Sequence, residues 1–141
     1  MEELQIILQV GVKALLRGPD GRYLLVRRNP KKYPEVGPKW DIIGGRIDPG
    51  ATLLENLRRE IREEVKLELL DEPKLVAAQD ILRVPGKHVV RLTYTASIQG
   101  EPALDDDHLE FRWFSLDQIK SMDEQELDVF FKELLDKGLF D

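Results

Sequence analysis

Three glutamates between residues 60 and 64 are the side chains of this sequence best suited to do chemistry. Glu60, Glu63 and Glu64 are spaced so that a helix would place them on one face, where like charges repel by roughly 0.2–0.5 kcal/mol per pair. A bound cation would offset this repulsion, and carboxylate oxygens are suitable ligands for Mg²⁺. The spacing therefore predicts a metal site, with ion pairs to neighbouring arginines on an exposed helix face as the competing interpretation.

A helix from residue 52 to about residue 65 is expected to position these carboxylates. Thr52 and Glu55 have the spacing of a capping box, which marks the start of a helix. Apolar residues recur along the segment every three or four positions and predict one buried stripe, made of Leu54, Leu57, Ile61 and Val65. At about 100° per residue, the glutamates fall beside this stripe, where a helix can border a cleft.

Strand-like segments surround the helix. Residues 6–16 and 23–28 are rich in aliphatic side chains and flank a Gly-Pro-Asp-Gly turn, which predicts a β-hairpin. Residues 75–84 and 88–99 flank Pro-Gly-Lys and predict a second hairpin. The proline-rich residues 29–38 are expected to form a surface loop beside the site.

The region after residue 100 is expected to hold one more strand and one more helix. Residues 101–107 form an acidic loop whose aspartates we interpret as solubilising charge, and residues 109–114 have an aromatic strand pattern. Asp123 and Glu126 have capping-box spacing and predict a C-terminal helix that ends at Gly138. Strands before, between and after two helices favour the α/β class, with a mixed β-sheet between helices.

Composition limits the classes of function. The chain has 141 residues, which suits one domain, and it has no cysteine, which excludes disulfides, thiolate ligands and cysteine nucleophiles. The formal net charge of −6 disfavours adhesion to a nucleic-acid polymer or to an anionic membrane. The first ten residues lack both a basic region and a long apolar run, so a cytoplasmic location is the default expectation.

Residues 45–67 resemble the signature box of the Nudix hydrolases, G-x5-E-x7-R-E-U-x-E-E-x-G-U, in which U is a bulky apolar residue. The residues that match it in type and spacing are Gly45, Arg59-Glu60-Ile61, Glu63-Glu64 and Leu67. Residues 40–45 are similar to the family's W-x-x-P-G-G lead-in, with isoleucine in place of proline, and residues 111–114 to its late aromatic strand. The resemblance implies a Nudix-type α/β/α sandwich that forms a single domain over residues 1–141.

Two positions depart from the box. Ala51 stands where the family has a glutamate of the carboxylate cluster, and Lys66 stands where it has glycine. The lysine charge suits a helix C-terminus, although a left-handed conformation there would cost lysine more than glycine. Arg59 can reach Glu55 and Glu63 on a helix, so we expect it to hold a carboxylate in position. We hypothesise that Glu55, acting through Arg59, partly replaces the missing glutamate.

The resemblance implies metal-dependent hydrolysis of a diphosphate bond in a nucleoside diphosphate linked to another moiety. Such substrates include nucleoside triphosphates, ADP-ribose and other nucleotide sugars. The implied cofactor is Mg²⁺ or Mn²⁺ held by Glu60, Glu63 and Glu64, and the implied general base is either Glu60 or Glu110. The partner would be a small-molecule nucleotide, and homodimers are common in the family. The alternative is a catalytically weak or inactive nucleotide-binding domain, motivated by the two departures from the box.

Basic residues on either side of the lead-in are candidates for contacts with phosphate. Arg28, Lys39 and Arg46 are expected to bind substrate, because arginine offers bidentate geometry to phosphate oxygens. Arg27 and Arg28 would point to opposite faces of a strand, so only one of them can face the cleft.

Aromatic residues and histidines leave two interpretations open. Trp113, and also Trp40, could stack on a nucleobase, although a large aromatic side chain in a small domain also suits the core. His88 and His108 are isolated in the sequence, and we interpret both as surface residues.

Overall fold

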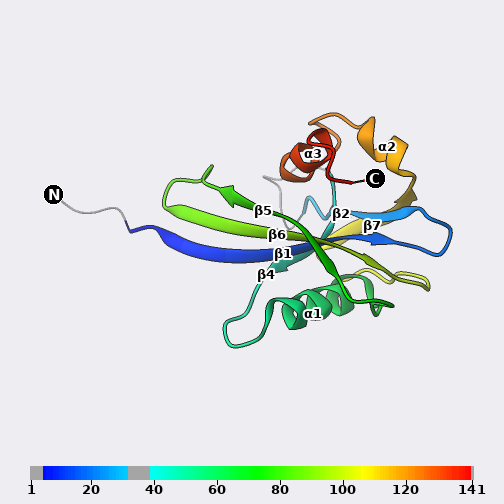
Figure 1. The fold of residues 1–141 in the computed structure, drawn as a ribbon, viewed down its shortest axis with the longest axis horizontal. Coiled ribbons are helices and arrows are strands. Elements are labelled where there is room, and N and C mark those ends of the chain that lie inside the picture. The colour runs from blue at the N-terminus through cyan, green and yellow to red at the C-terminus, as the bar shows by residue number, and fades with distance from the viewer. Residues whose placement is uncertain (1–4, 32–38, 141) are drawn as a thin grey trace.

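A mixed β-sheet forms the centre of the molecule, and helices cover both of its faces (Figure 1). This computed structural model describes residues 5–31 and 39–140. The strands are β1 (Ile7–Arg17), β2 (Tyr23–Arg28), β3 (Trp40–Asp41), β4 (Ile43–Arg46), β5 (Lys74–Ile81), β6 (Lys87–Ser97) and β7 (His108–Phe114). The helices are α1 (Leu53–Val65), α2 (Leu116–Lys120) and α3 (Val129–Asp136). Because α1 lies on one face of the sheet and α2 and α3 lie on the other, the expected α/β/α sandwich is confirmed.

The sheet is built around β1. The strand order is β3-β2-β1-β6-β5, with β4 paired to β1 and β7 paired to β2. Along its whole length β1 runs parallel to β6, and from Gly11 to Ala14 it also pairs antiparallel with β4. Alternate side chains of β1 point to opposite faces, so Val12 packs in the core under α1 and Leu15 packs in the core under α3.

The first hairpin is shorter than the sequence suggests. Among the described residues, β1 and β2 pair only at Leu16 with Leu24 and at Arg17 with Tyr23, because β4 pairs with residues 11–14 on that side of β1. The second hairpin is confirmed, since β5 and β6 pair antiparallel along β5. Most of the loop expected over residues 29–38 lies outside the described residues.

The C-terminal region holds two helices where one was expected. Asp123 and Glu126 do form reciprocal backbone-to-carboxylate hydrogen bonds, of 3.1 and 3.4 Å. No helix follows directly, because the backbone of Glu126 and Asp128 bonds to Trp40 in β3. Asp128 caps α3 instead, and Ser115 caps the short α2 with a complete capping box. None of the helices in the described segments is long and apolar enough to cross a membrane.

Helix α1 begins and ends as predicted. The Thr52 hydroxyl accepts a hydrogen bond from the Glu55 N–H at 3.1 Å, and Leu57 and Ile61 are buried against the sheet. Lys66 follows the last helical residue in the left-handed conformation, with φ 60° and ψ 36°. Among the described residues it is the only non-glycine with positive φ. Lysine in place of the box glycine therefore adopts a backbone conformation that is unfavourable for a residue with a Cβ.

Replacing Lys66 with glycine is expected to stabilise the protein by about 0.5–1 kcal/mol, because glycine adopts the left-handed conformation without a Cβ clash. The measurement is the urea midpoint of unfolding. Lys137 is a matched control, because it is the C-cap of α3 but has φ −79°, so Lys137→Gly should not stabilise. An unchanged or lowered midpoint for Lys66→Gly would show that position 66 is not strained.

Candidate active site

Glu60 and Glu64 point into a small pocket of about 160 Å³ at the junction of α1 and β4. Glu64 is buried, and its Oε2 accepts a hydrogen bond from the Gly44 N–H at 2.8 Å. Gly44 is required there because of the backbone of β1, and Gly45 leaves room for the Glu60 carboxylate. A Cβ on Gly44 would lie 1.9 Å from the Val12 carbonyl oxygen, and a Cβ on Gly45 would lie 2.9 Å from Oε2 of Glu60. The glycine pair thus lets the helix carboxylates approach the sheet.

Burial makes these two carboxylates difficult to ionise. It raises the pKa of Glu64 to about 8, and the nearby Glu60 and Asp105 carboxylates add to the effect while Lys13 opposes it. Burial also raises the pKa of Glu60, although the Arg59 guanidinium lowers it. Two carboxyl groups in this arrangement favour sharing a proton or binding a cation over carrying two charges.

Glu63 lies outside the pocket. Its side chain is 58% exposed, and its Oε2 lies 3.4 Å from Nη1 of Arg59. Within residues 5–31 and 39–140, no three acidic or histidine side chains are close enough together to hold a metal ion. The structure therefore brings together two of the three predicted ligands, Glu60 and Glu64, and leaves Glu63 beside them on the helix.

Arg59 contacts one of its two expected partners, Glu63, at 3.4 Å, and three others that were not expected. Its Nη1 donates to Glu60 at 3.2 Å and its Nη2 donates to Oδ1 of Asn56 at 2.8 Å. Asp48 lies 3.4 Å from the same guanidinium, whereas Glu55 is not among its partners in the described part of the chain. The expected contact between Arg59 and Glu55 is therefore wrong, because the first turn of α1 directs the arginine toward the loop before the helix.

His108 is not the surface residue that its sequence context suggests. Its side chain is 6% exposed, and its Nδ1 lies 2.6 Å from Asp105 and its Nε2 lies 3.8 Å from Glu64. Pairing of β7 with β2 places His108 opposite Arg28, and both residues line the small pocket. Asp105 therefore holds a histidine and is not only a solubilising charge. His88 is half-exposed at the surface, with its Nε2 2.7 Å from Oδ1 of Asp80.

Three other predicted site residues do not line the small pocket. Glu110 lies on β7 and forms an ion pair with Arg27 at 3.0 Å. Trp113 lies about 17 Å farther along β7 than His108 and packs against Gly18. Lys39 directly precedes β3.

Trp40 belongs to the core rather than to an open stacking site. It is buried and makes an edge contact with Phe114, with ring centroids 5.0 Å apart. The guanidinium groups of Arg27 and Arg112 lie over its ring, at 5.2 and 5.4 Å from the centroid. The tryptophan face is thus occupied by protein groups.

A basic cavity of about 350 Å³ adjoins the small pocket and shares Arg28 and Gly45 with it. Its cationic lining residues are Lys13, Arg28, Arg46, Arg83, Lys87 and Arg91, and its acidic ones are Asp41 and Asp128. The predicted phosphate contacts Arg28 and Arg46 therefore meet in one cavity, beside cations from β1, β6 and the loop after β5.

Charges in the basic cavity are only partly compensated. Burial alone would raise the pKa of Asp41, but Lys13 and Arg91 outweigh burial and hold that pKa below its usual range. The pKa of Arg46 is lowered by burial and by repulsion from Arg91 and Arg28. Within the described chain, Arg46, Arg83 and Lys87 have no acidic partner. An anionic ligand would relieve this repulsion.

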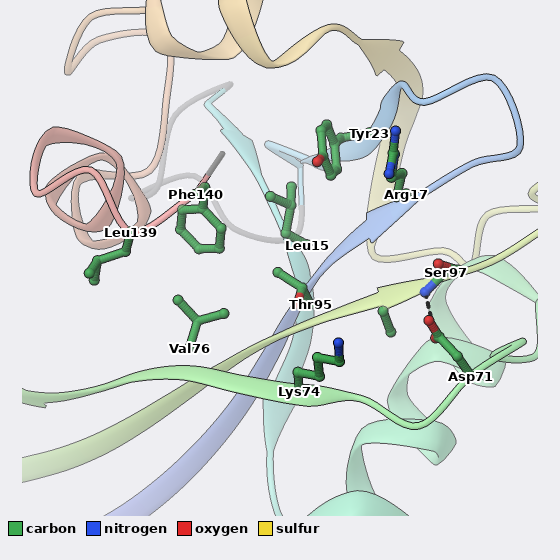
Figure 2. Close-up of a pocket in the computed structure, with 11 residues that line it drawn as sticks. Leu15, Arg17, Tyr23, Asp71, Lys74, Val76, Thr95, Ser97, Leu139 and Phe140 are labelled. Atoms are coloured by element: carbon green, nitrogen blue, oxygen red, sulfur yellow. Dashed lines mark hydrogen bonds between the residues drawn. The ribbon is translucent and has the colours of Figure 1, made fainter.

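Another cavity, of about 490 Å³, is lined by residues of β1, β5 and β6 and of the segment after α3 (Figure 2). Leu15, Val76 and Phe140 form its apolar wall, and the exposed Arg17 and Lys74 lie at its rim. Its one carboxylate among the described lining residues is Asp71, which accepts a hydrogen bond from the Ser97 N–H at 2.8 Å. Because it lacks paired carboxylates, we do not assign the chemistry to it.

Comparison with known proteins identifies relatives of this chain. The sequence is 45% identical over 51 residues to the nucleoside triphosphatase NudI of Escherichia coli K12, an alignment that covers 36% of each chain. The chain thus spans only about a third of the length of that curated relative.

Solved structures match over nearly the whole chain. The MutT protein of Methanosarcina mazei Go1 superposes with a TM-score of 0.80 and 25% identity, covering 96% of this chain and 95% of that one. The MutT NUDIX hydrolase of Burkholderia pseudomallei superposes with a TM-score of 0.73 and 29% identity, covering 92% and 97%. The family model for the NUDIX domain matches residues 7–134. The chain therefore belongs to the NUDIX family.

Proposed function

We propose that this protein hydrolyses a diphosphate bond in a nucleoside triphosphate or a related nucleoside diphosphate derivative, with the help of a divalent metal ion. The observation that carries the proposal is that the buried Glu64 and the partly buried Glu60 line a pocket that adjoins a basic cavity, with Arg28 and Gly45 shared between the two. A polyphosphate chain could place one phosphate beside the carboxylates and others among the cations. The printed activity of the NudI relative supports a triphosphate over the other nucleotides considered.

The donor set fits Mg²⁺ or Mn²⁺. Mg²⁺ is usually bound through one or two carboxylates together with substrate phosphates and waters, and Glu60 and Glu64 offer such a pair. We propose Glu63 as a third ligand, which requires its exposed side chain to turn from Arg59 toward the pocket. When bound, the metal would polarise a phosphate and lower the pKa of a water.

The chain's own residues have separate roles in this proposal. Arg28 and Arg46 bind phosphate oxygens, and Arg59 holds Glu60 in place through a 3.2 Å contact. Of the two general bases considered, Glu60 lines the pocket and Glu110 is paired with Arg27, so we propose Glu60. The buried His108 closes the pocket beside Glu64.

Hydrolysis can be tested by incubating the protein with Mg²⁺ and a panel of dGTP, dCTP, ATP and ADP-ribose, and assaying release of phosphate and pyrophosphate. Glu64→Gln is expected to lower kcat by about 100-fold or more, because metal stabilisation of charge is worth several kcal/mol. Nucleotide binding without any turnover would instead support the alternative, a binding domain. Turnover that survives Glu64→Gln would overturn the metal assignment.

Arg46→Ala is expected to raise KM by about tenfold or more, because a hydrogen bond to a charged group is worth about 1.5–3 kcal/mol. Arg58→Ala is the matched control, since Arg58 lies on α1, pairs with Glu72 and lines neither pocket. The measurement is the steady-state KM of both variants. Equal KM values for the two would remove Arg46 from the substrate site.

Glu64 should make the stability of the metal-free protein depend on pH. A carboxyl whose pKa is about 8 when folded and about 4.3 when unfolded keeps its proton more tightly in the fold. The protonated Glu64 carboxyl therefore stabilises the fold fully at low pH, and this stabilisation is lost as pH rises from about 5 to 8. In EDTA, the melting temperature of wild-type protein should fall over this range, and that of Glu64→Gln should fall less. Exposed Glu63→Gln is the control and should behave like wild type.

A further inference from the structure

Asn56 is a buried polar residue at the first turn of α1 that uses both ends of its amide. Its Oδ1 accepts hydrogen bonds from the Asp48 N–H and from Nη2 of Arg59, both at 2.8 Å. Its Nδ2 donates to the carbonyl oxygens of Thr52 at 2.9 Å, Ala51 at 3.3 Å and Asp48 at 3.4 Å. The donor end therefore holds the loop before the helix, and the acceptor end holds the arginine.

The arginine transmits this constraint to the carboxylates. Nη1 of Arg59 donates to Glu60 at 3.2 Å and to Glu63 at 3.4 Å, while Nη2 is held by Asn56. A guanidinium is planar and rigid, so fixing one nitrogen sets the direction of the other. Asn56 thus determines where Arg59 can meet Glu60.

Other anchors for Arg59 are weaker or absent. Asp48 is 73% exposed and 3.4 Å away, and exposed ion pairs contribute little because water screens them. Ala51 is exposed and has no side-chain acceptor, and its backbone oxygen accepts from Nδ2 of Asn56 rather than from Arg59. Asn56 is 1% exposed and shares a 2.8 Å hydrogen bond with the guanidinium.

We propose that Asn56 is a positioning residue that anchors Arg59, and through it Glu60, in place of the carboxylate that position 51 lacks. The inference rests on the proposed function, because it assigns Asn56 a role in metal binding and hydrolysis. A neutral amide holds the guanidinium without neutralising it, so the charge of Arg59 remains available to Glu60 and Glu63.

The test separates the two ends of the amide. Asn56→Ala removes both ends. Its affinity for Mn²⁺ without nucleotide, measured by EPR titration, should fall about 10- to 100-fold, and kcat should fall by a similar factor. Loss of a group that orients a metal ligand has effects of this size. Asn56→Asp keeps the acceptor oxygen and loses the donor, so it should keep most of the Mn²⁺ affinity despite a lower melting temperature. Ala51→Glu added to Asn56→Ala returns a carboxylate for Arg59 but cannot donate to the loop, so it should restore affinity without restoring the melting temperature.

Thr52→Ala is the matched control for stability. It removes the cap of the same helix end, where Thr52 accepts from the Glu55 N–H, and does not touch Arg59. We expect it to lower the melting temperature and to leave Mn²⁺ affinity and kcat unchanged. If it lowers them as much as Asn56→Ala does, the role of Asn56 is only structural and the proposal is overturned.

Three further results would contradict the proposal. A folded Asn56→Ala with wild-type Mn²⁺ affinity and kcat would overturn the positioning role alone. If Asn56→Ala does not fold, Asn56→Asp decides: retained Mn²⁺ affinity supports the proposal, and lost affinity overturns it. Wild-type protein that neither binds Mn²⁺ nor turns over any nucleotide would overturn the proposed function, and the positioning role with it.

Discussion

The burial of Glu64 against the backbone of β4 is the constraint on which the site depends. A carboxylate that is only 8% exposed, next to a second one, is costly without a cation, and burial raises its pKa to about 8. The fold accommodates it through two glycines that bring strand and helix together and through the Gly44 N–H. This arrangement lowers the stability of the metal-free protein and leaves a site that is ready to bind a cation.

Strand β1 contributes both to the core under the acidic helix and to the wall of the adjoining basic cavity. Val12 packs under α1, while its neighbour Lys13 points to the opposite face and pairs with Asp41 at 3.0 Å. Arg91 on the adjacent β6 binds Asp41 and Asp128, which also caps α3. The ion pairs that fix the cavity wall therefore also fix the start of a helix, so structure and binding share the same charges.

Local features could be predicted from the sequence, and features made by distant pairing could not. Thr52 and Lys66 end α1 as expected, because capping depends on neighbouring residues. His108 was misjudged because only the pairing of β7 with β2 brings it to Arg28, which is far away in the sequence. Asn56 gave one usable signal, a polar residue beside the apolar stripe, but its link to Arg59 depends on side-chain geometry.

Proton release on metal binding tests the central claim, that Glu64 is a buried metal ligand, most directly. Isothermal titration of Mn²⁺ into metal-free protein at pH 7, in two buffers that differ in ionisation enthalpy, gives the number of protons released. Since a ligand must be deprotonated to bind, wild-type protein should release about one proton per metal ion, and Glu64→Gln should release almost none. Mn²⁺ binding by wild-type protein without proton release would contradict the account.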